Sequence, residues 1–205
     1  MAMNTIDCLR EVSRTVDGIL LFDNNVWKKQ GQPVKNSYDI MNHELVTPLS
    51  LLLGAGEARK DKVGINIIDA SEIISTWEKF SYLGYSEMKV KTVRDRLIFF
   101  KEKTSMDQLN PATRCYTAIR NAATARLSGE ADLGKARKAL MLIAGPPDEL
   151  SKEGFSHAKE WLEGSIATSE VRGGDCPIPG WDSIAAVVML SGYTEIPRLR
   201  IMLHR

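Results

Sequence analysis

Residues 140–162, LMLIAGPPDELSKEGFSHAKEWL, join a short apolar run to an amphipathic stretch. Leu140 to Ala144 is a short run that is apolar on both faces, which is typical of a buried strand. Gly145-Pro146-Pro147 ends this run, because proline has no N–H to donate to a sheet. Ser151 then indicates the N-cap of an amphipathic helix that extends to Leu162. A buried strand that leads into an amphipathic helix predicts an α/β protein.

The sequence around this unit predicts a mixed β-sheet with helices packed on it. After residue 57 the expected order of elements is helix, strand, helix, strand, helix, strand, strand. The expected helices end near residues 80, 126 and 162. The expected strands cover residues 87–93, 140–144, 169–172 and 184–190.

Residues 1–56 have a different pattern from the rest of the chain. A helix at 5–13 precedes an apolar run at 16–22, which predicts a buried parallel strand whose neighbours lie outside this chain. A long helix is expected from Ser37 to about Gly56. The charged residues Glu57 to Lys62 indicate a boundary after it, so we expect two units, 1–56 and 57–205.

Composition and charge argue against several classes of protein. Lys and Arg number 27 and Asp and Glu number 26, and both signs are interspersed, so no patch for nucleic acid or for an anionic membrane is expected. The longest apolar runs, such as Ile184 to Leu190, are too short to insert into a bilayer, and no signal-peptide pattern is visible, so we expect a cytoplasmic protein. Cys8, Cys115 and Cys176 are scattered, which argues against a disulfide framework or a metal site.

Two of the candidate sites suit a nucleotide base. Asn24 follows the strand at 16–22, and ligands gather at the carboxyl ends of strands in open α/β sheets, although Asn24-Asn25 is also ordinary turn chemistry. Tyr38 and Asn42 lie one turn apart on a helix. An aromatic ring beside an amide is able to hold a purine; alternatively, Tyr38 packs in the core and Asn42 is simply exposed.

The third candidate is a pair of acids, Asp69 and Glu72, three residues apart at the start of a helix. Two carboxylates on one face are able to polarise a water for attack on a phosphate. The competing interpretation is a capping box, in which Asp69 is the N-cap and Glu72 reaches back to the Asp69 amide. The two roles are compatible for Asp69, whereas they compete for the side chain of Glu72.

In this order the motifs resemble the tubulin/FtsZ superfamily, and most of all the archaeal tubulin-like group called CetZ. Residues 16–25, VDGILLFDNN, look like its strand and loop that end in an Asn contacting ribose and guanine. Residues 37–43, SYDIMNH, are similar to the start of its core helix, where Tyr stacks on guanine and Asn pairs with it. Residues 66–73, NIIDASEI, look like its synergy loop, and residues 135–145 and 185–200 resemble later segments.

The resemblance implies the mixed sheet of the FtsZ/tubulin C-terminal domain, preceded by the last strand and core helix of the nucleotide domain. It implies a polymer-forming GTPase of the cell-division or cell-shape class, with GTP or GDP and Mg²⁺ as ligands of the full-length protein. Asn24, Tyr38 and Asn42 would contact the base. Asp69 and Glu72 would complete the GTP site of the next subunit in a head-to-tail filament.

The glycine loop of that family, G-G-G-T-G-[ST]-G, does not occur in these 205 residues. We therefore expect the chain alone to be inactive and to hold no nucleotide tightly. Two other functions stay open from the sequence. One is a non-catalytic adaptor or polymer partner built on the same fold, and the other is a small independent α/β enzyme that uses Asp69 and Glu72 on a soluble substrate.

Overall fold

A single mixed sheet organises the protein, whose computed structural model describes residues 2–27, 34–56, 66–90, 109–125 and 127–197. Its strand order is β1-β2-β5-β3-β4. β1 (Gly18–Leu21) pairs in parallel with β2 (Lys79–Lys89), and β3 (Lys138–Gly145) pairs in parallel with β4 (Glu170–Pro177). The central strand β5 (Ser183–Tyr193) runs antiparallel to both β2 and β3.

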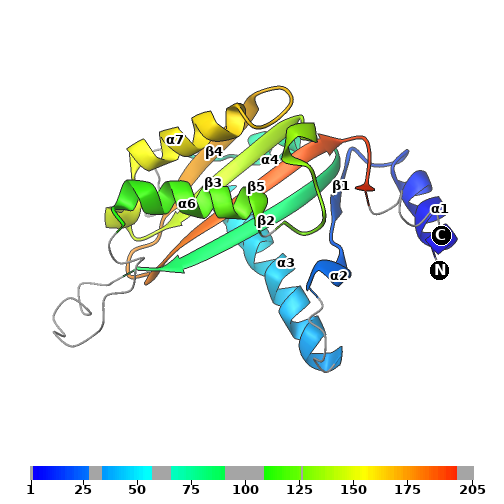
Figure 1. Cartoon of the computed structure of the whole chain (residues 1–205), viewed down its shortest axis with the longest axis horizontal. Helices are drawn as coiled ribbons and strands as arrows, with labels where there is room; N and C mark the ends of the chain where they lie inside the picture. The colour runs from blue at the N-terminus through cyan, green and yellow to red at the C-terminus, as the bar shows by residue number, and fades with distance from the viewer. Residues whose placement is uncertain (1, 28–33, 57–65, 91–108, 126, 198–205) are drawn as a thin grey trace.

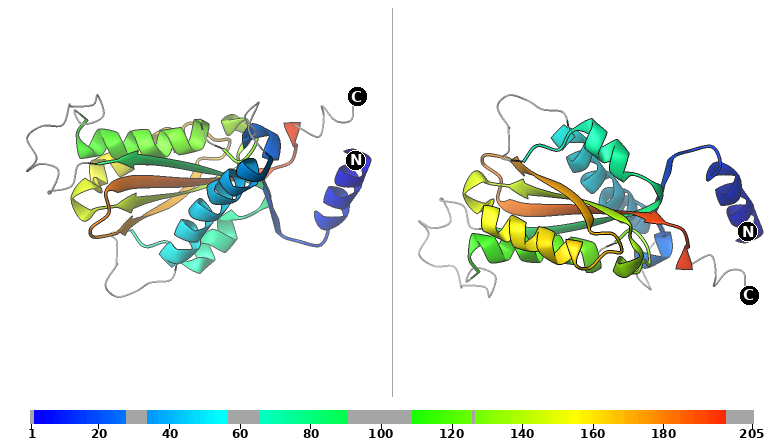
Figure 2. Two further views of the ribbon diagram at one scale, coloured as in Figure 1. Left: turned by 90° about the horizontal axis from the view of Figure 1, so that it is seen from below. Right: turned by 90° about the horizontal axis from the view of Figure 1, so that it is seen from above.

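Helices cover both faces of this sheet, as Figures 1 and 2 show. α6 (Pro111–Thr124) and α7 (Lys152–Glu163) lie on one face, whereas α3 (Val34–Gly56) and α4 (Ala70–Thr76) lie on the other. α2 (Asn24–Trp27) follows β1 and contacts α3. α1 (Ala2–Val12) lies beyond β1, away from the sheet.

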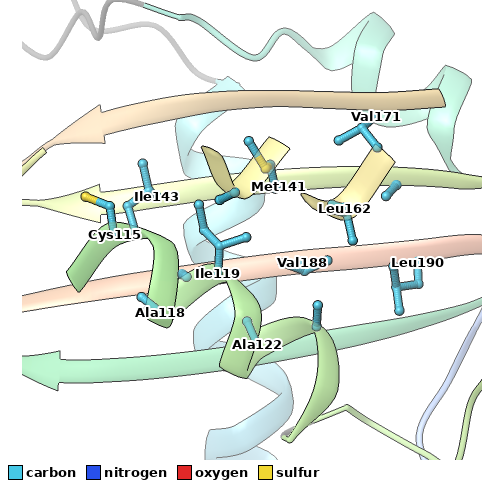
Figure 3. Close-up of a cluster of buried hydrophobic side chains, with 14 of the residues drawn as sticks. Cys115, Ala118, Ile119, Ala122, Met141, Ile143, Leu162, Val171, Val188 and Leu190 are labelled. Carbon is cyan, nitrogen blue, oxygen red and sulfur yellow. The ribbon is translucent and has the colours of Figure 1, made fainter. Parts of the chain in front are cut away.

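Alternating side chains of the inner strands fill two cores, one on each face. The first core, part of which Figure 3 shows, includes Ile119 of α6 and Leu162 of α7. The second includes Leu52 of α3 and Ile73 of α4. β3 and β5 contribute alternate residues to each core, so the two inner strands join both halves of the hydrophobic interior.

Among the described residues after 57, the helices and strands follow the predicted order, and the fold class is confirmed. The helix starts follow from local chemistry. Asn110 caps α6, its side chain accepting a hydrogen bond from the N–H of Thr113 at 2.7 Å, and Pro111 occupies the first helical position. Ser151 caps α7 through the N–H of Gly154 at 3.3 Å.

Several predicted boundaries are wrong. The strand expected at 87–93 is the end of β2, which begins at Lys79, and residues 91–93 lie outside the described residues. The preceding helix, expected to reach residue 80, therefore ends at Thr76. The error has a physical cause, because a continuous apolar run such as 82–85 does not distinguish a strand from a helix by its periodicity. β4 is longer than the predicted 169–172, and α3 begins at Val34 rather than Ser37.

β1 also differs from the strand that was expected. All four of its residues are half-buried, because β1 is an edge strand, and its neighbour β2 belongs to this chain rather than lying outside it. The division of the chain after residue 56 falls at residues outside the described part, so the two-unit organisation stays a prediction.

We expect the amide hydrogens of β1 to exchange with solvent faster than those of β5. β1 is a short edge strand, whereas β5 is buried at every position between two partners, and local opening is easiest where few apolar contacts must break. Hydrogen exchange on the dilute, monomeric chain measures this difference. Equal and strong protection in both strands would contradict it.

Candidate functional site

Asp69 and Glu72 form a complete capping box at the start of α4. Oδ1 of Asp69 accepts a hydrogen bond from the N–H of Glu72 at 2.8 Å and another from the hydroxyl of Ser71 at 2.6 Å. In return, the carboxylate of Glu72 accepts a bond from the N–H of Asp69 at 3.4 Å. The Glu72 half of the box is the weaker one, because 3.4 Å is long for an N–H···O bond.

The same hydrogen bonds keep Asp69 ionised. The hydroxyl of Ser71, followed by the N–H of Glu72, holds the pKa of Asp69 below its ordinary value of 3.8, and the positive charge of Arg172 adds a smaller effect. Asp69 is also exposed to solvent. The site therefore presents a fixed, negatively charged carboxylate at the surface.

The loop before α4 is attached to the edge strand β4. The N–H of Asp175 donates to the carbonyl of Asn66 at 2.9 Å, and the N–H of Asn66 donates to Oδ1 of Asp175 at 2.7 Å. Ile68, in the same loop, is buried in the second core. Sequence reasoning missed this attachment. Its only signal was Gly173-Gly174, since glycine inside a strand often marks the close approach of another segment.

Asn24 lies at the carboxyl end of β1, where it was predicted, as the exposed first residue of α2. Ser128 fixes this end of the strand: its hydroxyl donates to the carbonyl of Leu21 at 2.6 Å, and its own carbonyl accepts from the N–H of Asp23 at 2.7 Å. The side chain of Asp23 accepts from the N–H of Asn25 at 2.9 Å, so the turn chemistry is present as well.

Tyr38 and Asn42 are both exposed on α3. Tyr38 is 54% exposed, so the alternative in which it packs in the core is wrong. Because α2 contacts α3, the three residues predicted to contact a base lie on two helices that touch each other (Figure 1).

The length of α3 separates these residues from the acid pair. Leu52, near the C-terminal end of α3, shares the second core with Ile73 of α4, whereas Tyr38 is near the N-terminal end. A rise of 1.5 Å per residue places Tyr38 and Leu52 about 21 Å apart along the axis. Within one copy, the acids and the base-side residues therefore lie toward opposite ends of one long helix.

Other kinds of site find no support in the described part of the chain. In these residues no three His, Cys, Asp or Glu side chains come together in a way that could hold a metal ion. None of the described helices combines the length and the apolar character needed to cross a membrane.

Comparison with known proteins identifies the family. Residues 31–205 match the family described as "Tubulin-like CetZ, C-terminal domain". The chain belongs to the tubulin-like CetZ family. Tubulin-like protein CetZ1 of Haloferax volcanii is 34% identical over 97% of this chain and 53% of its own length. CetZ3 of the same organism is 34% identical over 97% of this chain and 52% of its own length, so the chain spans about half of these curated relatives.

Solved CetZ structures share the fold. The GDP-bound monomer of H. volcanii CetZ1 has a TM-score of 0.78 at 31% identity, over 99% of this chain and 54% of that one. The GTPγS-bound protofilament of CetZ2 has a TM-score of 0.79 at 27% identity, over 100% and 55%. An FtsZ dimer from M. jannaschii shares the fold alone, with a TM-score of 0.68 at 14% identity over 93% and 50%. The predicted resemblance to the tubulin/FtsZ superfamily is therefore confirmed.

The geometry of the capping box predicts unequal effects of two substitutions. Asp69→Ala should lower the urea midpoint of unfolding more than Glu72→Ala, because Asp69 accepts the two shorter bonds.

The effect of Asp69→Ala on the urea midpoint should also depend on pH. The difference in midpoint between this variant and the unchanged chain should be complete above pH 3.8, the ordinary pKa, and should shrink as the pH falls through the lowered pKa of the folded state. Urea titrations between pH 6 and pH 3 measure both effects. Equal losses for the two variants, or a difference that does not depend on pH, would contradict them.

Proposed function

We propose that this chain is the C-terminal half of a polymer-forming GTPase of the cell-division or cell-shape class, and that Asp69 and Glu72 complete the hydrolysis site of the adjacent subunit. The observation that carries the proposal, in a chain of the CetZ family, is that the base-side residues and the acid pair lie toward opposite ends of α3. Tyr38 lies about 21 Å along the helix axis from Leu52, and Leu52 shares the second core with Ile73 of α4. Acids placed this way are too far from a base held by their own copy. A head-to-tail neighbour would bring them to the phosphate end of the next nucleotide.

Two relatives support the ligand and the assembly in this proposal. One CetZ structure is a GDP-bound monomer, and another is a protofilament with GTPγS bound. We extend guanine-nucleotide binding and self-assembly to the protein that contains this chain. In that assembly, the guanine would stack on Tyr38 and pair with the amides of Asn24 and Asn42.

The role of Asp69 in the reaction follows from its charge. Its pKa is lowered, so it is a weak base and suits a role in orienting the attacking water by accepting a hydrogen bond. Burial against a neighbouring subunit would raise that pKa and make the carboxylate a stronger base. To orient the water together with Asp69, Glu72 must give up its hydrogen bond from the N–H of Asp69. Breaking this bond costs little free energy because the bond is long, at 3.4 Å.

Mg²⁺, when bound to the triphosphate, would neutralise charge that develops during phosphoryl transfer. The described residues offer no cluster of acids that fits a metal ion. We therefore assign no ligand to the metal in this chain, and the roles of Asp69 and Glu72 do not involve it.

Replacing either acid tests the proposal in a protein that joins this segment to a glycine-loop half. Asp69→Ala or Glu72→Ala should leave GTP binding intact and lower hydrolysis by about two to four orders of magnitude. Polymers should persist longer, because hydrolysis is what dismantles them. The matched control is Glu153→Ala, which removes an exposed acid from the first turn of α7 and should leave turnover unchanged. Phosphate release per assembled subunit is the measurement.

Mixing two inactive variants tests whether the acids act across subunits. One variant has a disabled glycine loop and the other carries Asp69→Ala. Where they meet in a mixed filament, an intact loop faces an intact acid pair, so part of the GTPase activity should return. Mixed filaments that form without any recovery of activity would overturn the proposal.

The 205-residue chain by itself should bind GTP only weakly. Phosphate contacts dominate nucleotide affinity, and the sequence contains no glycine loop to make them, whereas Asn24, Tyr38 and Asn42 would contact only the base. Isothermal titration calorimetry of the chain with GTP measures this. A dissociation constant in the micromolar range would show that the chain carries a phosphate site of its own.

A further inference from the structure

The segment that leads into the acid pair is held by consecutive contacts with β4 and the core. Asn66 and Asp175 exchange two hydrogen bonds, of 2.7 and 2.9 Å. Ile68 is 2% exposed and fills part of the second core. Asp69, the next residue, caps α4. The position of the first acid is therefore determined by the position of this segment on the sheet.

The edge of the sheet provides the attachment point. β4 is the last strand, and it pairs with β3 on one side through the register Ile143 to Asp175. On the other side of β4, where a further strand would pair, the carbonyl of Asn66 accepts a hydrogen bond from the N–H of Asp175. Gly174 permits the close approach, because a Cβ at that residue would lie 2.5 Å from the carbonyl oxygen of Asn66 and 2.7 Å from Cγ1 of Ile68.

The far end of α4 is fixed as well. Lys138 of β3 donates to the carbonyl of Ser75 at 2.9 Å, and Arg172 of β4 donates to the Ser75 hydroxyl at 2.6 Å. The hydroxyl of Ser191 on β5 donates to the carbonyl of Thr76. Three strands thus hold the C-terminal turn of this short helix. At the other end, the carboxylate of Asp175 binds the backbone of the segment that leads into the helix.

We propose that Asp175 is a positioning residue for the acid pair, acting through the backbone of Asn66. This inference rests on the proposed function of Asp69 and Glu72. The pairing of β4 with β3 uses backbone groups. Oδ1 of Asp175 accepts the N–H of Asn66 at 2.7 Å, so the side chain binds the loop that leads to the acid pair. A hydrogen bond between an ionised carboxylate and a backbone N–H is stronger than a neutral one, which suits it to hold an exposed segment in place.

The expected effect comes from geometry. A displacement of about 1 Å at a reacting group is able to lower a rate by about a hundredfold. Asp175→Ala removes the bond to the N–H of Asn66, while the bond from the Asp175 N–H stays possible. GTP turnover per assembled subunit should fall by about tenfold to a hundredfold, with GTP affinity and the amount of polymer unchanged. Asp175→Asn keeps an acceptor oxygen and should restore most of the turnover.

The experiment uses the protein that joins this segment to its nucleotide-binding half, with Asp175→Ala, Asp175→Asn and Asp69→Ala compared side by side. Asp148→Ala is the control, since it removes an exposed aspartate from the 3-10 turn Pro147–Glu149. Hydrogen exchange of the Asn66 amide, measured in the 205-residue chain, is a readout that does not depend on activity. It should accelerate in Asp175→Ala and stay slow in Asp175→Asn and Asp148→Ala.

Each outcome separates this inference from the proposed function. If Asp69→Ala loses hydrolysis while Asp175→Ala retains the unchanged protein's turnover, Asp175 does not position the acids, although the acids themselves do act. If Asp69→Ala retains full hydrolysis, the proposed function fails and the positioning role fails with it. If Asp175→Ala does not fold, Gly174→Ala tests the same contact, because its methyl group displaces Asn66, and unchanged turnover in that variant overturns the inference.

Discussion

The central strand β5 is buried on both faces, and this burial dictates where the helices must lie. Every residue from Ser183 to Tyr193 is buried, and the strand bonds to β2 on one side and to β3 on the other. A strand that is apolar on both faces needs helices on both, since either face left open would expose a large apolar area to water. α6 and α7 meet this need on one face, and α3 and α4 on the other. A buried polar group in such a strand needs a hydrogen-bond partner, and the hydroxyl of Ser191 donates to the carbonyl of Thr76.

This layering also decides where the candidate residues lie. α3 and α4 share one face, so the C-terminal half of α3 is fixed against α4 through Leu52 and Ile73. The N-terminal half contacts α2, and its residues Tyr38 and Asn42 are exposed. The length of α3 therefore sets the separation between the two groups. Under the proposed function, stacking identical copies in one direction would bring the acid end of one copy to the base end of the next.

Local chemistry was readable from the sequence, whereas long-range contacts were not. The cap Ser151, the breaker Gly145-Pro146-Pro147 and the apolar run of β5 carry their own signals, and these elements were predicted close to their observed positions. The start of β2 was missed because its apolar run lacks alternation. The bond between Asn66 and Asp175 joins residues 109 positions apart, and no periodicity or local motif encodes such a pair. The acid pair could therefore be proposed from the sequence, whereas the contacts that hold it in place required the fold.

The capping box and the proposed reaction do not exclude each other, although they compete for Glu72. Oδ1 of Asp69 accepts the N–H of Glu72 at 2.8 Å and the Ser71 hydroxyl at 2.6 Å, so α4 keeps its N-cap wherever the Glu72 side chain lies. The bond from the Asp69 N–H to Glu72 is longer, at 3.4 Å, and an exposed N–H released from it is satisfied by water. Glu72 therefore has a defined resting place in the isolated chain and leaves it at low cost. An approaching subunit that offers a better partner, such as the attacking water, would shift Glu72 outward without unfolding the start of the helix. Under the proposed function, the capping box is the resting state of the site, and assembly converts it into the active arrangement.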